Sequence, residues 1–239
     1  MRIAAIIRKE WEEALRNWLV LSSIVIPPVL FIGIQLMAFR EALSKTADPR
    51  MQQALVSQMM TMYLFIPLIA PTSILAYSVV GEKTNRSLEP LLATPITDSE
   101  FMLGKALAGI IPGLASTWGA YGLFLVAAWL VIGPWIMPVV ASPTWLLIIL
   151  VMGSILSFDA AMLELIVSSR VNDPRAAQQL GAMLVIPVVI LSIGLGLGKV
   201  LIGPVTVLAA CAVLLVVGCF MFRAAVSLFQ RETILTRWK

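Results

Sequence analysis

The sequence contains no histidine and few charged residues. None of its 239 residues is His, and only 13% are Asp, Glu, Lys or Arg. Histidine is the commonest metal ligand and the commonest general base near neutral pH, so its absence removes the usual acid–base chemistry and the usual metal site. The two cysteines, Cys211 and Cys219, lie eight residues apart in one apolar run, where they cannot pair with each other, and we expect them to be packing residues. The sequence therefore predicts no catalytic residue, no metal site and no cofactor bound by this chain.

A nucleotide-binding motif is also missing from the sequence. Residues 194–199 read GLGLGK, which superficially resembles a phosphate-binding loop. A P-loop needs a glycine five residues before Gly198 and a Ser or Thr after Lys199, and neither is present. The sequence also lacks a clear internal repeat of the kind that would indicate a self-contained secondary transporter built from inverted repeats. Any energy-driven process would therefore depend on a separate protein.

Apolar residues dominate the composition. Hydrophobic residues make up 60% of the chain, and its mean hydropathy is +0.96. A spanning helix needs about 20 consecutive, mostly apolar residues. We therefore expect an all-α integral membrane protein that forms a single transmembrane domain over residues 1–239. The six expected spans are 19–39, 59–80, 106–132, 145–167, 180–197 and 205–222, of which the last two are the shortest.

The distribution of positive charge predicts how the chain is oriented in the lipid bilayer. If the N-terminus is cytoplasmic, only four of the 17 Lys and Arg residues fall in outer segments, namely Arg40, Lys45, Arg50 and Lys199. The positive-inside rule then predicts a multi-pass protein of the cell membrane with both termini in the cytoplasm. The net charge of +4 reflects this topology and does not indicate nucleic-acid binding. The first outer segment, 40–58, is expected to be a short polar loop with no room for a receptor domain.

The two ends of the chain are expected to lie at the inner membrane surface. Residues 1–18 have the pattern of an amphipathic helix, although Glu10 falls inside the apolar arc. A basic-faced helix with Trp before a span is typical of a helix in the membrane interface, the alternative being a solvated juxtamembrane helix. Residues 223–239 form a polar, basic tail.

The segment 81–105 is a polar stretch between two long apolar runs. Ser87 is suited to N-cap a short helix whose Leu88, Leu91 and Leu92 would form one apolar stripe. After Pro95, the residues 97–100 read TDSE, the pattern of a capping box that begins a second helix. From spacing alone, any short connector between membrane helices would look similar.

Specific residues in this loop nevertheless resemble those of a known family, the ABC-2 type transporter permeases, which are membrane subunits of ABC exporters. In the first cytoplasmic loop, the residues that carry the resemblance are Glu82, Lys83, Arg86, Ser87, Leu88, Glu89, Leu91, Leu92, Pro95, Glu100, Gly104 and Lys105. A second resemblance lies in residues 168–179, where a Ser-Arg pair and a later Ala-Gln-Gln resemble the family's second cytoplasmic loop. There, Asp173 followed by Pro174 is also a helix-start signal. The Lys9-Glu10 pair resembles one found in the family's N-terminal interfacial helix.

The resemblance implies a mechanism and a set of partners. In this family the first loop carries a coupling helix that docks into a groove on a separate ATPase subunit, which holds the ATP and Mg²⁺. The permease pairs with a second copy or a paralogue, and the substrate leaves between them. The residues expected to couple to the ATPase are Glu82, Arg86, Leu88, Glu89, Leu91 and Leu92, and those of interest in the second loop are Arg170, Asp173 and Gln178.

Two acidic residues, Asp159 and Glu164, lie inside the fourth apolar run. Ionisable groups at membrane depth are costly, so both are candidates for a functional role. We expect Asp159 to line a polar pathway or to make a buried helix contact. For Glu164, near the inner end of the run, the alternative is that it simply reaches interfacial water. An intramembrane enzyme that uses both is disfavoured, because a five-residue offset places them about 140° apart on a helix.

The main alternative to a transport subunit is a non-transporting membrane anchor or assembly subunit. Such a protein would recruit a soluble partner through the same loop. ATP-dependent movement of a substrate would distinguish the two hypotheses.

Overall fold

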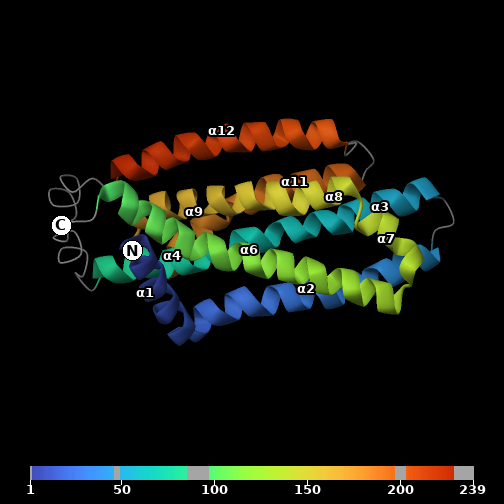
Figure 1. The fold of residues 1–239 in the computed structure, drawn as a ribbon, viewed down its shortest axis with the longest axis horizontal. Helices are drawn as coiled ribbons and strands as arrows, with labels where there is room; N and C mark the ends of the chain where they lie inside the picture. The colour runs from blue at the N-terminus through green and yellow to red at the C-terminus, as the bar shows by residue number, and fades with distance from the viewer. Residues whose placement is uncertain (1, 46–48, 85–96, 197–202, 229–239) are drawn as a thin grey trace.

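The computed structural model describes residues 2–45, 49–84, 97–196 and 203–228, and within these ranges every regular element is helical (Figure 1). The elements, in order, are α1 (Arg2–Arg16), α2 (Trp18–Lys45), α3 (Pro49–Thr61), a 3-10 turn (Met62–Phe65), α4 (Ile66–Thr84), α6 (Asp98–Val131), a 3-10 turn (Pro134–Ile136), α7 (Met137–Val140), α8 (Pro143–Leu147), a π-helical segment (Ile148–Met152), α9 (Gly153–Arg170), α10 (Pro174–Gly181), a 3-10 turn (Ala182–Leu184), α11 (Val185–Gly196) and α12 (Pro204–Leu228).

Five helical stretches in the described part of the chain are long and apolar enough to cross a membrane. They are Trp18–Glu41, Leu55–Thr84, Ser99–Val131, Pro143–Arg170 and Pro204–Leu228. An all-helical membrane protein is therefore confirmed, and each of these stretches overlaps one predicted span. The fifth predicted span, 180–197, overlaps a shorter apolar helix, Pro174–Ile190, so this span, and with it the total of six, stays a prediction.

The outer segment 40–58 differs from the expected loop. Helix α2 continues to Lys45, and α3 begins at Pro49 and runs on towards α4. Continuing a helix satisfies the backbone N–H and C=O groups of polar residues as well as those of apolar ones. Hydropathy therefore marks where the apolar stretch ends, whereas the helices extend beyond it.

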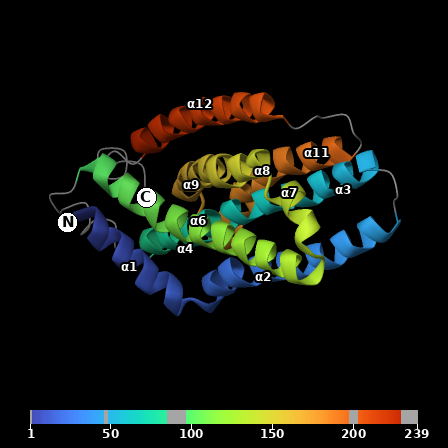
Figure 2. The ribbon, with the colours of Figure 1, turned by 45° about the vertical axis from the view of Figure 1, so that its right-hand side comes forward.

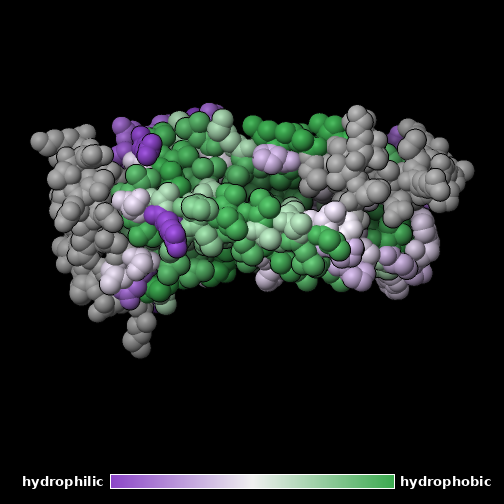
Figure 3. All heavy atoms as spheres, turned by 90° about the horizontal axis from the view of Figure 1, so that it is seen from above, coloured by the Kyte–Doolittle hydropathy of each residue, from purple (hydrophilic) through white to green (hydrophobic). Residues whose placement is uncertain are grey.

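Helix α4 lies at the centre of the bundle, packed against α2, α6, α9 and α10. In the stretch Leu55–Thr84, 78% of the most apolar window is buried, against 17% for both Trp18–Glu41 and Pro204–Leu228. Helices α2 and α12 are therefore peripheral, and Figure 1 and Figure 2 show them at opposite sides of the bundle. On the face that Figure 3 shows, hydrophobic residues cover most of the middle, and hydrophilic residues gather towards the two ends.

Of the three apolar clusters among the described residues, two are large and hold most of the helices together. The larger includes an aromatic group in which Tyr63 contacts Tyr121 and Phe124, and the Tyr121 hydroxyl donates to the carbonyl of Val140 at 2.7 Å. The smaller cluster, at the other end, contains Ile6 of α1. Helix α1, which runs obliquely to the bundle in both ribbon views, is therefore packed into the protein by one face (Figure 1, Figure 2).

Candidate functional site

The predicted coupling residues fall into two groups in the structure. Glu82 lies in α4 and is described, whereas Arg86, Leu88, Glu89, Leu91 and Leu92 lie outside the described residues, in the segment 85–96. The structure does show the two ends of this segment, which are Thr84 at the end of α4 and Thr97 before α6. We call residues 85–96 the loop and examine its two ends as the candidate site.

A cluster of four charged residues, three of them buried and the fourth, Lys9, half-buried, lies at the base of the loop. Lys105, in α6, is 0% exposed, and its Nζ lies 2.9 Å from Glu10 Oε1 and 2.7 Å from Glu82 Oε2. It also donates to Ser78 Oγ at 2.5 Å. Lys9 of α1 donates to Glu82 Oε1. We call Lys9, Glu10, Glu82 and Lys105 the charge cluster; it joins α1, α4 and α6, and its formal charges balance.

Burial and pairing oppose each other in this cluster. Burial raises the pKa of Glu10, but the Lys105 ammonium, the Ser78 hydroxyl and Lys9 outweigh it and hold that pKa below its ordinary value of 4.5. Burial lowers the pKa of Lys9, but its hydrogen bond to Glu82 and the nearby carboxylates raise it above 10.5. Removing one partner of a buried ion pair typically costs about 3–5 kcal/mol, because it leaves a buried charge without compensation. This cost applies to Glu10, Glu82 and Lys105, which are buried, and less to the half-buried Lys9.

The far end of the loop is fixed by the capping box that the sequence predicts. The Thr97 hydroxyl accepts a hydrogen bond from the backbone N–H of Glu100 at 3.2 Å. In return, Glu100 Oε2 accepts from the backbone N–H of Thr97 at 3.0 Å. These bonds satisfy donors that the first turn of α6 would otherwise leave free, so the helix begins where the loop ends.

The second predicted loop contacts the first through α4. Lys83 Nζ donates to the carbonyls of Ser169 and Val171, at 3.2 Å and 3.4 Å. These carbonyls lie where α9 ends, next to the exposed Arg170. The end of α4 that leads into the loop is therefore attached to the segment between α9 and α10.

Both other residues expected in the second loop make defined contacts. Asp173 caps α10 as predicted, with Oδ2 accepting from the N–H of Ala176 at 2.9 Å. Gln178 Nε2 donates to Ser73 Oγ of α4 at 2.7 Å. The second loop is thus positioned by its own cap and by α4.

Asp159 and Glu164 face two different helices. Their exposed fractions are 1% and 0%, and the structure gives none of their four carboxyl oxygens a hydrogen-bond partner among the described residues. A Cβ atom added to Gly218 of α12 would lie 2.3 Å from Asp159 Oδ1. One added to Gly181 of α10 would lie 1.8 Å from Glu164 Oε2. Asp159 therefore makes a buried helix contact, whereas the interpretation that Glu164 reaches interfacial water does not hold, because α10 covers it.

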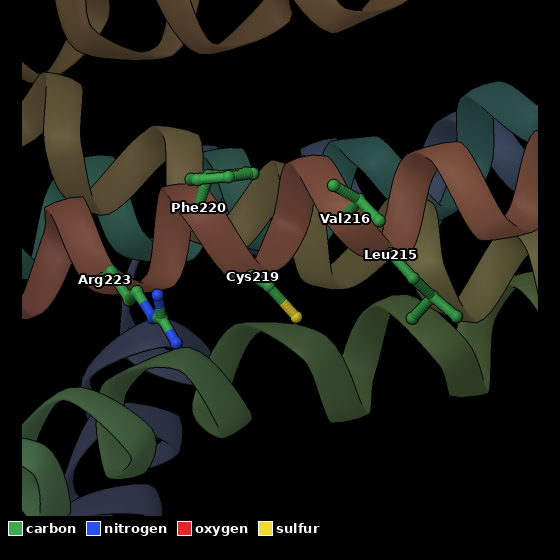
Figure 4. Close-up of a pocket in the computed structure, with 5 residues that line it drawn as sticks. All are labelled: Leu215, Val216, Cys219, Phe220 and Arg223. Carbon is green, nitrogen blue, oxygen red and sulfur yellow. The ribbon is translucent and has the colours of Figure 1, made fainter.

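The structure also has a mostly apolar groove along α12, which lies apart from the charged residues at the loop. It is lined by Leu215, Val216, Cys219, Phe220 and Arg223, which all belong to this helix. Figure 4 shows Leu215, Cys219 and Arg223 on the same side of α12, with the guanidinium of Arg223 as the charged group of the set. An apolar groove on a peripheral helix is suited to a lipid chain or a neighbouring helix, and it adds nothing to the site at the loop.

Comparison with known proteins decides the family. A family model described as "ABC-2 family transporter protein" matches residues 4–229, from α1 to the segment after α12. The chain belongs to the ABC-2 transporter family. A search of curated proteins found no match. The chain is therefore a membrane transport component of the ABC type, and the matched region includes the loop and both of its ends.

The sequence pointed to Glu82, Lys105 and the Lys9-Glu10 pair through their resemblance to the family, but it did not predict that these residues contact one another. By residue pattern alone, Glu10 is an interruption of an apolar arc. That interruption was the available signal, because a carboxylate on the buried face of an amphipathic helix needs a cation or donor opposite it. Which cation it meets depends on how α1 packs against α6.

Proposed function

We propose that this chain is the permease subunit of an ABC-2 exporter, driven by a separate ATPase subunit that docks on the loop at the cytoplasmic face. The observation that carries the proposal is the buried charge cluster at the loop's base, together with the capping box at its far end. A segment that receives force from a partner needs rigid ends. Here both ends are fixed by contacts that would be costly to break.

In this proposal the leucines of the loop fill a groove on the ATPase. Leu88, Leu91 and Leu92 supply the apolar stripe, and Arg86 and Glu89 set its register. ATP and Mg²⁺ bind to the partner, and two permease copies, identical or paralogous, enclose the path of the substrate. The contact between Lys83 and the segment after α9 would let the second loop, with Arg170 and Asp173, respond to the same movement.

Export is favoured over import by the outer segments. The stretch between the first two spans is short and largely helical, so it offers no domain that could capture a substrate outside the cell. Uptake would require a further protein for that step. A substrate that enters from the cytoplasm or the inner leaflet needs no such partner.

The test uses Leu88→Asp combined with Leu91→Asp. We expect the double variant to lose co-purification with the ATPase subunit, because two carboxylates would be buried in an apolar groove. The matched control is Ser99→Asp, which adds a carboxylate to an exposed position in the first turn of α6, where negative charge is tolerated. Undiminished binding by the double variant would contradict the docking role of the leucines.

The alternative of a non-transporting anchor makes a different prediction in the same preparation. An anchor would bind the ATPase without changing its turnover. A permease is expected to change the rate of ATP hydrolysis when the two are reconstituted in lipid vesicles, because the closing motion must work against the membrane domain. Equal ATPase rates with and without the permease would favour the anchor.

A further inference from the structure

Helix α1 is fastened to both ends of the loop by one set of contacts. Glu82 lies three residues before the loop, and Lys105 lies in the second turn of α6 after it. The 2.7 Å ion pair between them holds the two ends side by side. Glu10 binds Lys105 and Lys9 binds Glu82, so α1 contacts each end separately.

These contacts differ from apolar packing because they cannot slide. Ile6 of α1 packs so closely on α6 that a Cβ at Gly104 would lie 2.9 Å from its Cδ1, but such apolar contacts can be exchanged for neighbouring ones. A buried carboxylate such as Glu10 that moves away from Lys105 loses the cation that compensates its charge, which is costly. The ends of α4 and α6 and the whole of α1 are therefore expected to move as one body.

The first span begins directly after α1. A single residue, Asn17, separates α1 from α2, and its Oδ1 accepts a hydrogen bond from the N–H of Leu19 at 3.1 Å, which caps α2. With one residue between them, a displacement of α1 must displace the start of α2. Helix α2 is also among the least enclosed spans, and it packs against α4 and α6 by one side only, so its outer side does not oppose a displacement.

We propose that the charge cluster passes movement of the loop to α1 and, through Asn17, to the first span. In this role Lys9, Glu10, Glu82 and Lys105 are positioning residues, and α1 is part of the transmission path as well as a membrane-surface helix. The inference rests on the proposed function, because it takes the loop as the point where the ATPase acts.

The experiment measures hydrogen–deuterium exchange of the purified complex of permease and ATPase, with and without Mg·ATP trapped by vanadate. The main variant neutralises all four residues at once, as Lys9→Met, Glu10→Gln, Glu82→Gln and Lys105→Met. It leaves no buried charge uncompensated, because Glu13, which also pairs with Lys9, is exposed, and the apolar contacts of α1 remain, so we expect it to fold. The control is Arg8→Gln with Glu12→Gln, which removes the exposed ion pair on the opposite face of α1.

In the native complex and the control, trapping is expected to change exchange at residues 98–105 and at residues 2–28. In the neutral variant the change at 98–105 persists, while the change at 2–28 falls by at least half. A full-sized change at 2–28 in that variant, or none in the native complex, overturns the inference. If the neutral variant does not fold, the double variant Glu10→Gln with Lys105→Met takes its place, since it removes one charge of each sign. We expect trapping to change exchange at residues 2–28 less in this double variant than in the native complex, and a change as large as the native one also overturns the inference.

The same samples separate this inference from the proposed function. If the native chain binds no ATPase, or if trapping leaves residues 98–105 unchanged, then the loop is not the point of coupling and the proposed function fails. If the loop responds and α1 does not, only the transmission through α1 fails.

Discussion

The indole N–H of Trp11 donates a hydrogen bond to the backbone carbonyl of Ala108, 2.9 Å away. Ala108 lies four residues before Pro112 in α6, and proline has no N–H, so this carbonyl has no donor within its own helix. Trp11 supplies the donor that the proline removes. Helix α1 thus provides a contact that α6 needs, about one turn beyond the charge cluster.

This relationship predicts a coupling between Trp11→Phe and Pro112→Ala. In the native background, Trp11→Phe leaves the Ala108 carbonyl unpaired, which costs about 1–3 kcal/mol in addition to the lost apolar contact. In the Pro112→Ala background the helix supplies its own N–H, so the same substitution loses only the apolar contact. The free energy of unfolding, measured in detergent micelles for all four proteins of the cycle, should therefore be non-additive by about 1 kcal/mol or more. Equal costs in both backgrounds would contradict this role of Trp11.

The charge cluster predicts how stability depends on pH. The folded-state pKa of Glu10 is lowered from 4.5, so its contribution is fully present above that value and is lost as the pH falls through the lowered pKa. The pKa of Lys9 is raised from 10.5, so its contribution is present below that value and is lost only at higher pH. Between these limits the contributions of Glu10 and Lys9 are constant.

The measurement compares the native chain with Glu10→Gln by thermal unfolding at a series of pH values. Between about pH 5 and pH 10 we expect a constant destabilisation by the substitution. As the pH falls below 4.5, the stability difference between the two proteins should shrink, because the unfolded chain protonates Glu10 first, and it should disappear once the pH is below the lowered pKa of the folded state. Arg8→Gln, on the exposed face of α1, should differ much less from the native chain in thermal stability. A Glu10→Gln gap that widens in acid would show that Glu10 is not held as a carboxylate by Lys105.

Gly181 and Gly218, which lie opposite Glu164 and Asp159, are expected to be needed for stability because they leave room for the two carboxyl groups. Gly181→Ala places a methyl group where Glu164 Oε2 lies, so the carboxyl must move, at a cost of about 1–3 kcal/mol. The cost should fall in the background Glu164→Ala, where the space is free. Gly119→Ala in α6 is the control, since nothing lies within 4 Å of its added Cβ, and alanine is favoured over glycine in a helix by about 0.5–1 kcal/mol.

Stability to denaturation in micelles checks all of these variants. If Gly181→Ala is as well tolerated as Gly119→Ala, the glycine does not make room for Glu164. Gly218→Ala, opposite Asp159, should follow the same pattern as Gly181→Ala.

Local signals in the sequence predicted local structure well. The TDSE pattern at Thr97 and the Asp-Pro pair at Asp173 both cap helices in the structure, because a cap depends on residues only three positions apart. The long apolar runs also predicted five membrane helices correctly, because the length and composition of one continuous segment are enough to identify such a helix. The ends of these helices were less predictable, as the helical residues 40–45 and 49–58 show.

The charge cluster could not be predicted in full, because its members come from three distant parts of the chain. Glu10 and Lys105 are 95 residues apart, and only the packing of α1 on α6 brings them together. The rule that places Lys and Arg on the inner side treats Lys105 as a charge near water, whereas the folded chain buries it completely. Sequence alone showed one anomaly, the position of Glu10, and the structure supplied its explanation.

The capping box at the end of the loop gives the last prediction. Thr97→Val keeps the shape of the side chain but removes the hydroxyl that accepts a hydrogen bond from the N–H of Glu100. The first turn of α6 should therefore be less stable by about 0.5–2 kcal/mol. Hydrogen–deuterium exchange should show this as faster exchange of the amide hydrogens of residues 98–101. Thr97→Ser and Glu100→Gln keep the pattern of a capping box and should behave like the native chain. Because the charge cluster holds Lys105 further along α6, the acceleration should stop before residue 105. Faster exchange that spreads through residue 105 in Thr97→Val would show that the cap, and not the cluster, holds this end of the loop in place.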